Sequence, residues 1–436
     1  MQRFNERTTV TSTREVVLGS SNTDILFIID NSNSMKEEQD NLIRNTGIFI
    51  EELAKSDNAY RVGIVTTDAI AEGGKLRMRR ATQSELNAAG CNIGPDNSGL
   101  FYLVRPALDD PQSQQKRCRL QEDFIATVKS LGIEGSGREA GLAAARFSVG
   151  DAVPSTVQHN DDFLRVDADL ALIFMTDEDD CSFAQYGSGP WGNARCYEEI
   201  AGAIAVNDFV DFFTELKSST SGIRATRAAL IGGGGFSGEG NADFEPRGCW
   251  LTNQSASTNC GCWSSSNDDF FCTYLEDFGH SCSEKDRCNL EACDALPAGR
   301  YHSFIKELRR RRLAAGFPGG TFEDSICLAE YDTTLLTIVR NVVLSECFEL
   351  YEPPTDPALI QFSMTRVDGT TGQSVPVGVP RYDPTDTQAE CQSCGDCSSG
   401  AWRLVNPTTI CLECGLRKQT GDAFTIYALT DLVEAP

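Results

Sequence analysis

Five consecutive residues, Asp30-Asn31-Ser32-Asn33-Ser34, carry side chains suited to holding a metal ion. A carboxylate and two hydroxyls, separated by single residues, offer hard oxygen atoms, which are the ligands that Mg²⁺, Mn²⁺ and Ca²⁺ prefer. The D-x-S-x-S pattern alone is weak evidence, because short polar runs between a strand and a helix also serve as turns and helix caps. The run indicates a metal site only if other loops supply further ligands.

The flanking sequence indicates that this run follows a buried strand. Residues 25–29 are all apolar, as is typical of a strand covered on both faces of a parallel sheet. Residues 35–55 follow with apolar side chains at helical spacing. Because ligands of open α/β sheets bind beyond the carboxyl ends of the strands, the D-x-S-x-S run is expected at the binding edge.

The same alternation continues through the first 350 residues. Further strands are expected at 61–66, 170–176, 227–233 and 324–327, and further helices at 122–131, 141–147, 198–217, 302–315 and 333–347. Strands that alternate with helices predict an α/β fold with a mostly parallel, doubly wound sheet.

Two more polar residues follow in an order that completes a site. The strand at 170–176 ends in Asp177, and Ser136 lies between two glycines shortly before the helix at 141–147. A strand followed by D-x-S-x-S, then a hydroxyl flanked by glycines, then a strand followed by Asp resembles the von Willebrand factor A (VWA) domain. That family builds its metal-ion-dependent adhesion site (MIDAS) from these three loops. The resemblance covers about residues 22–350 and implies a Rossmann-like fold.

The resemblance also implies a role for each residue. Ser32, Ser34 and Ser136 would contact the metal through their hydroxyls, and Asp30 and Asp177 would lie close by and act largely through water. Few anionic ligands leave the ion electrophilic, with one position open for a carboxylate from a partner. The family usually has Thr at the position of Ser136, where Ser keeps the hydroxyl but lacks the methyl group that restricts its rotamer.

Three other acidic residues are candidates for an accessory metal site. Asp179 and Asp180 belong to an acidic run after the strand at 170–176, and Asp68 follows the strand at 61–66. Neighbouring carboxylates repel one another unless a cation or solvent screens them. A solvated loop is the alternative for the acidic run, and a turn or helix cap is the alternative for Asp68.

Eighteen cysteines indicate an oxidising compartment outside the cytoplasm. Seven of them lie within 249–293 and five within 391–414. Both numbers are odd, so if every cysteine is paired, each cluster sends at least one disulfide outside itself. The paired C-x-x-C spacing of the second cluster leaves zinc as an alternative to disulfides. We expect two local disulfides, Cys91–Cys118 and Cys181–Cys196.

Composition changes along the chain predict four regions. Residues 1–22 are expected to be a leader or linker, and 23–350 the VWA domain. Residues 236–298 are expected to be a cysteine-rich insertion in that domain, and 351–436 a small β-rich region held by disulfides.

Charge and motifs exclude several classes of function. The formal charge of −25 disfavours nucleic acids and anionic lipids as partners. No apolar run approaches the ~18–20 residues that span a bilayer. No signal peptide is visible, which is expected of a mature exported form; a lipid anchor would have been removed with the native N-terminus. None of the three histidines accompanies a nucleophile motif, so we do not expect an enzyme.

These features together predict metal-dependent adhesion or partner binding at a cell surface, through Mg²⁺, Mn²⁺ or Ca²⁺. The ligand would be a protein or surface polymer that offers a carboxylate. The cysteine content and the run at 176–182 resemble exported VWA proteins of predatory and gliding bacteria, such as the adhesin of myxobacterial gliding motility. This implies a surface adhesin, for example an outer-membrane lipoprotein. The alternative is a structural or assembly component of a bacterial envelope complex with a vestigial metal site.

Overall fold

The computed structural model describes most of the chain outside one long central stretch. The described residues are 8–16, 22–54, 59–107, 110–136, 139–150, 154–182, 203–217, 222–233, 295, 298–315, 317, 319–326, 328, 330–344, 347–350, 354, 356–368, 371, 373–384, 389–397, 400–406, 409–414, 416 and 422–431.

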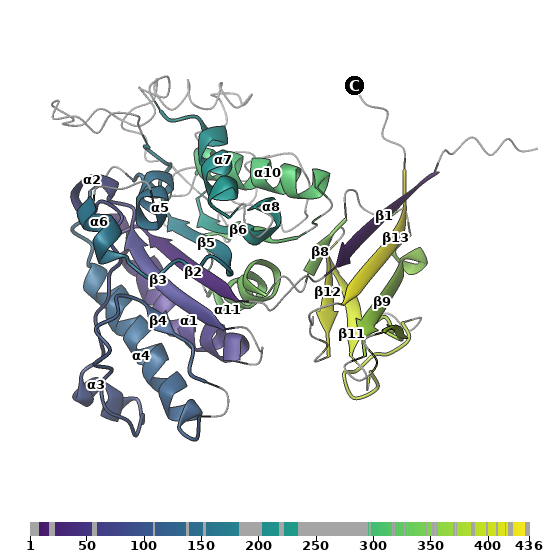
Figure 1. The fold of residues 1–436 in the computed structure, drawn as a ribbon, viewed down its shortest axis with the longest axis horizontal. Helices are drawn as coiled ribbons and strands as arrows, with labels where there is room; N and C mark the ends of the chain where they lie inside the picture. Colours follow the sequence, from purple (N-terminus) through teal and green to yellow (C-terminus); the bar gives the residue numbers. More distant parts are fainter. Residues whose placement is uncertain are drawn as a thin grey trace, which may run out of the picture.

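A six-stranded sheet forms the centre of the larger of two units (Figure 1). The strand order is β4-β3-β2-β5-β6-β7, and every pair is parallel except β4 on β3. The strands are β2 (Thr23–Ile29), β3 (Tyr60–Thr66), β4 (Leu103–Val104), β5 (Asp169–Thr176), β6 (Thr226–Gly232) and β7 (Thr321–Ser325). If the six strands are numbered 1 to 6 along the chain from β2 to β7, their order across the sheet is 3-2-1-4-5-6, as in doubly wound folds. The predicted α/β class is confirmed, and β2 and β5 flank the switch point where such folds bind ligands.

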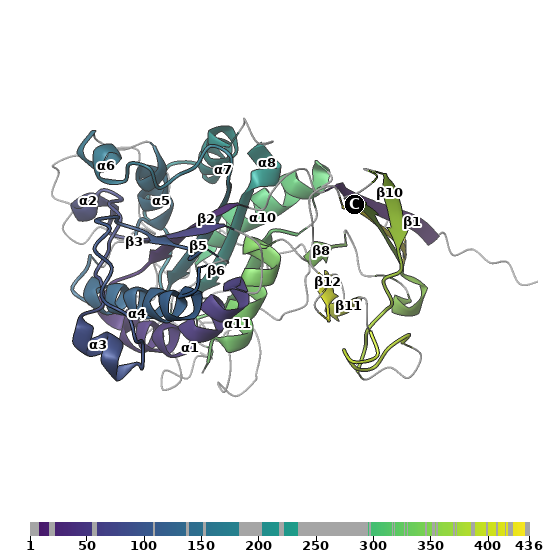
Figure 2. The same cartoon turned by 60° about the horizontal axis from the view of Figure 1, so that its bottom comes forward.

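Helices cover both faces of this sheet (Figure 2). One face carries α1 (Lys36–Ala54), α4 (Ser113–Leu131) and α11 (Asp332–Thr337), which continues as the π-helix η6 (Ile338–Val343); the other carries α5 (Gly141–Val149), α7 (Val206–Leu216) and α10 (Gly299–Ala314). The side chains of β2 point alternately to the apolar cores on the two faces of the sheet. Phe27 packs against α1 and α4, whereas Leu26 and Ile28 face the core of α5, α7 and α10. Burial on both faces explains the uninterrupted apolar run.

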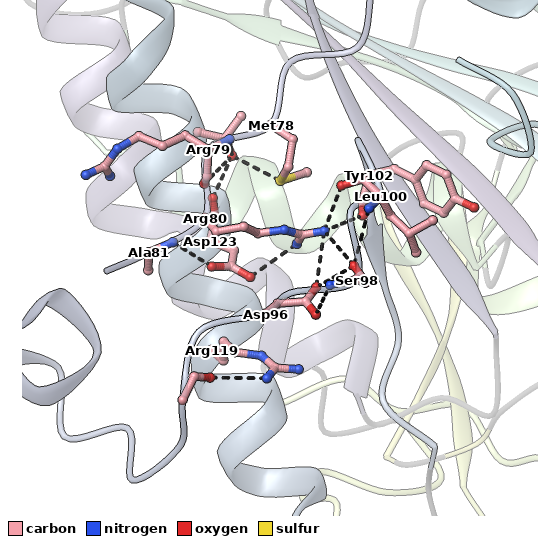
Figure 3. Close-up of polar contacts among 12 residues, drawn as sticks. Met78, Arg79, Arg80, Ala81, Asp96, Ser98, Leu100, Tyr102, Arg119 and Asp123 are labelled. Carbon is pink, nitrogen blue, oxygen red and sulfur yellow. Dashed lines mark hydrogen bonds and ion pairs between the residues drawn. The ribbon is translucent and has the colours of Figure 1, made fainter. Parts of the chain in front are cut away.

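Short helices and a stapled loop complete this unit. The short elements are η1 (Asn33–Met35), α2 (Ala69–Glu72), α3 (Gln83–Ala88), α6 (Pro154–His159) and α8 (Gly222–Ala225). The loop before β4 is held by Arg80, which donates to the carbonyls of Leu100 (2.9 Å) and Tyr102 (3.2 Å) and pairs with Asp123 (Figure 3). The predicted Cys91–Cys118 disulfide is present and fixes the same region to α4.

The second unit consists of antiparallel strands around its own apolar core (Figure 1). One sheet has the order β1-β13-β9-β10 and the other β11-β12-β8. The elements are β1 (Thr8–Val16), β8 (Cys347–Glu349), η7 (Pro357–Leu359), β9 (Gln361–Val367), β10 (Ser374–Val377), β11 (Ala401–Asn406), β12 (Thr409–Glu413) and β13 (Ala423–Asp431). Phe348, Ile410 and Phe424 are among its buried side chains. The C-terminal region is therefore β-rich, as the sequence predicts.

Two predicted elements need correction. Residues 8–16, expected within a leader, form β1, which pairs with β13 from Thr8↔Asp431 to Val16↔Ala423. Their many Thr and Val residues favour a strand, but their polarity obscures the periodicity of an edge strand. The helix expected over 333–347 ends at Val343, and Cys347 begins β8. In the chain, the α/β unit therefore lies between the first and the later strands of the β unit.

The cysteines at 391–414 form disulfides, so the alternative that they bind zinc is wrong. Cys391 pairs with Cys397, and Cys394 pairs with Cys414. Cys411 is also disulfide-bonded, so its partner lies outside the five tail cysteines, as their odd number predicts. The β8–β12 register places Cys347 opposite it.

Other sequence predictions lie partly or wholly outside the described residues. Cys181 is disulfide-bonded, but its predicted partner Cys196 is outside the described residues. Nearly all of the cysteine-rich insertion at 236–298 also lies outside the described residues, as do residues 198–202 of a predicted helix. Within the described part of the chain, no helix has the length and apolar character needed to cross a membrane.

Candidate metal site

Asp30 joins the carboxyl ends of β2 and β5. Its backbone N–H donates to the carbonyl of Met175 (2.9 Å). Its Oδ2 accepts from the Thr176 hydroxyl (2.8 Å), and its Oδ1 accepts from the Ser32 backbone N–H (2.7 Å). Asp30 is fully buried. Its carboxylate therefore fixes the conformation of the loop that follows.

The two serines of the motif lie together, and Ser34 is near Asp177. Ser32 has an extended backbone, and the 3₁₀ turn η1 follows it directly. This bend brings the hydroxyls of Ser32 and Ser34 within 3.1 Å of each other. The Ser34 hydroxyl lies near enough to the carboxyl group of Asp177, the residue that follows β5, to lower its pKa against the effect of burial. The motif and the end of β5 thus lie side by side.

The loop that carries Ser136 packs directly on the motif. Gly135 donates its backbone N–H to the carbonyl of Asn31 (2.8 Å). A Cβ atom at Gly135 would lie 2.4 Å from Asn31 Oδ1, so a larger residue there would displace the Asn31 amide group. Gln39 bridges the same two loops, donating to the carbonyls of Asp30 (3.0 Å) and Gly132 (3.2 Å). All three loops named from the sequence therefore meet at one edge of the sheet.

The carboxyl groups of Asp30 and Asp177 are both buried and lie close to each other. Burial and the negative charge of Asp30 raise the pKa of Asp177 to about 9. Burial also raises the pKa of Asp30, against hydrogen bonds from Ser32, Thr176 and Asp177 that lower it. Ionising two adjacent buried carboxyl groups at once is energetically unfavourable unless a cation balances their charge.

Sequence reasoning missed Glu139, which is also buried at this edge. Its Oε2 accepts from the hydroxyl of Thr67, the residue after β3. Burial, and then the charge of Asp30, raise the pKa of Glu139 well above its ordinary value. One signal in the sequence could have identified it. Glu139 is an acidic residue immediately before a run of small and apolar residues that begins a buried helix.

Several buried oxygens here have no hydrogen-bond partner among the described residues. They are Asn31 Oδ1, Glu38 Oε2, Glu139 Oε1 and Asp177 Oδ1. An unpaired buried acceptor costs about 1–3 kcal/mol, and more if charged, so native proteins rarely keep one without a reason. A hard divalent cation would satisfy such oxygens. The residues at this edge therefore fit a divalent metal.

The hydroxyls are essential to any such site. Across the described residues, no three His, Cys, Asp or Glu side chains are arranged to hold a metal ion by themselves. A metal at this edge would depend on serine oxygens, as the D-x-S-x-S pattern predicts.

Asp179 and Asp180 have structural partners in place of the accessory metal expected from the sequence. Asp179 Oδ1 accepts from the backbone N–H of Arg300 (2.8 Å). Asp180 accepts from the backbone N–H of Leu142 (3.0 Å), the hydroxyl of Ser182 (2.7 Å) and Nε of Arg300 (3.1 Å). Both are buried, so the solvated-loop alternative is also wrong.

Asp68 is a helix cap. Its Oδ1 accepts from the backbone N–H of Ala71 (3.0 Å) and so begins α2. This is the helix-cap alternative named from the sequence, and the accessory metal role of Asp68 stays a prediction.

A cavity of about 380 Å³ lies away from this edge, between α4 and the loop before β4. It is lined by Arg80, Lys116 and Arg119 among others. Lys116 pairs with Asp110. Arg80 is held as described above, and Arg119 donates to the carbonyl of Gly94; both arginines are drawn in Figure 3. Because these cationic groups already bind protein acceptors, the cavity carries no ligand assignment.

Comparisons with known proteins give structural likenesses only. No protein-family model and no curated protein matches the sequence. Among solved structures, the chain is similar to a von Willebrand factor type A protein from Catenulispora acidiphila. The identity is 11% over 98% of this chain and 62% of that chain, with a TM-score of 0.31.

Two further structures are similar at the same level. One is the pilus adhesin SpaC from Lactobacillus rhamnosus GG in its open conformation, with 11% identity over 98% of this chain and 41% of that chain and a TM-score of 0.31. The other is the manganese-loaded TRAP protein of Plasmodium vivax, with 15% identity over 52% of this chain and 61% of that chain and a TM-score of 0.21. This chain spans less than two thirds of each of the three proteins. Likenesses at this level carry no conclusion about function.

Proposed function

We propose that this chain is a divalent-metal-dependent binding protein with a MIDAS-like site at the carboxyl edge of β2 and β5. The observation that carries the proposal is that the Ser32 and Ser34 hydroxyls lie 3.1 Å apart, with Ser34 beside Asp177, whose Oδ1 is buried and has no hydrogen-bond partner among the described residues. A site built this way offers hydroxyl and carboxylate oxygens without a nucleophile–histidine pair, so we propose binding and not catalysis.

Each residue of the site would have a distinct role. Ser32, Ser34 and Ser136 would supply hydroxyl oxygens to Mg²⁺, Mn²⁺ or Ca²⁺, and Asp177 a carboxylate. Asp30 orients the motif through the Ser32 N–H and the Thr176 hydroxyl. The ion, when bound, supplies a Lewis acid that accepts an acidic group of another molecule.

The partner and location are part of the same proposal. Disulfides in both units favour an extracytoplasmic protein. The chain has a formal charge of −25, which repels a protein or surface polymer that bears carboxylates. A bound metal ion would provide the attractive contact with such a partner. A cell-surface adhesin, of the lipoprotein type expected from the sequence, is the form we propose.

Metal titration of the whole chain tests the site. We expect Mg²⁺ or Mn²⁺ to raise the melting temperature and EDTA to reverse the rise, since a ligand at 100 times its Kd stabilises by about 2.7 kcal/mol. Ser34→Ala should weaken the affinity measured by calorimetry about tenfold or more. Ser98→Ala is the matched control, because Ser98 is also an exposed serine bonded to an aspartate.

A second measurement tests the open position. Protein-bound Mn²⁺ relaxes the protons of its coordinated water, and a short glutamate-containing peptide that displaces this water should lower the relaxation. No metal binding by the wild-type chain at millimolar concentration would contradict the proposal. The envelope-assembly alternative, with a vestigial site, would then be the better account.

A further inference from the structure

Glu139 lies across the end of β2. Its side chain accepts from Thr67, which follows β3, and its backbone carbonyl accepts from the N–H of Cys181 in the loop after β5. β2 is the strand between β3 and β5. Thr67 in turn donates its N–H to the carbonyl of Ile29 (3.3 Å), the residue before Asp30. Glu139 is thus tied to both neighbours of the strand end that carries the motif.

The remaining oxygen of Glu139 has no partner of its own. Oε1 has no hydrogen bond among the described residues, and the side chain is fully buried. The Thr67 hydroxyl occupies only Oε2. The fold therefore holds a carboxyl group rigidly at the binding edge and leaves half of it unsatisfied.

We propose that Glu139 is a buried carboxylate beside the metal site, and that its charge, added to those of Asp30 and Asp177, strengthens the binding of an ion whose ligands include serine hydroxyls. This inference rests on the proposed metal function. It adds a negative charge that the D-x-S-x-S, Ser136 and Asp177 set does not contain. Extra charge binds the cation more tightly when no partner is present, and it makes the metal-free site self-repulsive.

Glu139→Gln should change metal affinity and stability in opposite directions. Glutamine keeps the shape and an oxygen for the Thr67 hydroxyl but removes the charge. We expect the Kd for Mn²⁺, measured by calorimetry, to weaken about 10- to 100-fold. The melting temperature in EDTA should rise by about 2–4 °C, because one buried carboxyl group without compensation has been removed.

Glu52→Gln is the matched control. Glu52 is also buried, but it is paired with Arg340 (2.9 Å) and lies on α1, within Lys36–Ala54. Removing its charge leaves a guanidinium without part of its compensation. We expect this variant to melt at a lower temperature in EDTA and to bind Mn²⁺ with the wild-type Kd.

The outcomes separate this inference from the proposed function. If the wild-type chain binds Mn²⁺ and Glu139→Gln binds it equally well, the role of Glu139 is wrong and the metal function stands. If the wild-type chain binds no Mn²⁺, both are wrong. Should Glu139→Gln not fold, Glu139→Met removes the charge with a side chain of similar length, and an unchanged Kd in that variant would overturn the inference in the same way.

Discussion

Asp177→Asn should greatly weaken divalent-metal binding and, at pH 8, should make the metal-free protein more stable than the wild type. The first effect is expected because the buried carboxylate beside the Ser34 hydroxyl is lost, and the affinity should fall by at least about 100-fold. The second is expected because burial and the charge of Asp30 raise the pKa of Asp177 to about 9. The wild-type fold therefore opposes ionisation of this group, and asparagine removes the conflict.

The pH dependence has a definite sign. A carboxyl group whose pKa is higher in the folded than in the unfolded chain binds more protons in the folded state. Stability of the metal-free wild type should therefore fall as pH rises from about 5 towards about 9, by up to about 1.4 kcal/mol per pH unit for one proton. Urea unfolding in EDTA at several pH values measures this slope. Asp177→Asn should flatten it, and saturating Mg²⁺ should flatten it in the wild type.

Asp123→Asn provides the comparison for Asp177. Asp123 is equally buried, but it has protein partners in Arg80 and the backbone N–H of Ala81 (2.8 Å). We expect this variant to be less stable than the wild type and to bind metal normally. If Asp177→Asn binds metal with the same affinity as the wild type, Asp177 is not a ligand and the proposed site is wrong.

The sequence predicted the centre of the sheet and the loops of the site well, for a physical reason. Strands buried on both faces appear as uninterrupted apolar runs, and polar residues directly after them must lie at the carboxyl edge. Asp30 and Asp177 follow such runs, and β2 and β5 proved to be adjacent. The role of Ser136 stays a prediction, but the residue before it, Gly135, donates its backbone N–H to the carbonyl of Asn31 in the motif.

Other features could not be predicted because they depend on contacts between distant segments. β1 pairs with a strand more than 400 residues away and has the polarity of an edge strand. Glu139 shows no metal-binding motif, and its importance appears only when Thr67 and Cys181 are placed on either side of it. The acidic run after β5 was expected to face solvent or a cation, but helix N–H groups and Arg300 compensate it.

Asp180→Ala should destabilise the fold strongly without removing the metal site. Its carboxylate accepts from the N–H of Leu142 at the start of α5 and from the guanidinium of Arg300 at the start of α10. Removing one partner of a buried ion pair typically costs about 3–5 kcal/mol, because the other charge stays buried. Urea unfolding measures the loss, and calorimetry with Mn²⁺ should still give one bound ion per chain.

The double variant with Arg300→Met separates the ion pair from the helix cap. If Asp180 acts mainly by compensating Arg300, removing both charges should cost less than the sum of the single substitutions. A remaining loss of about 1 kcal/mol would represent the lost acceptor for the Leu142 N–H. A small effect of Asp180→Ala with a loss of bound metal would instead return Asp180 to the accessory metal site. Asp177 and Asp180 are three residues apart. Loss of metal binding in the Asp177 variant and loss of stability in the Asp180 variant would show that neighbouring residues of one acidic loop bind the metal and stabilise the fold.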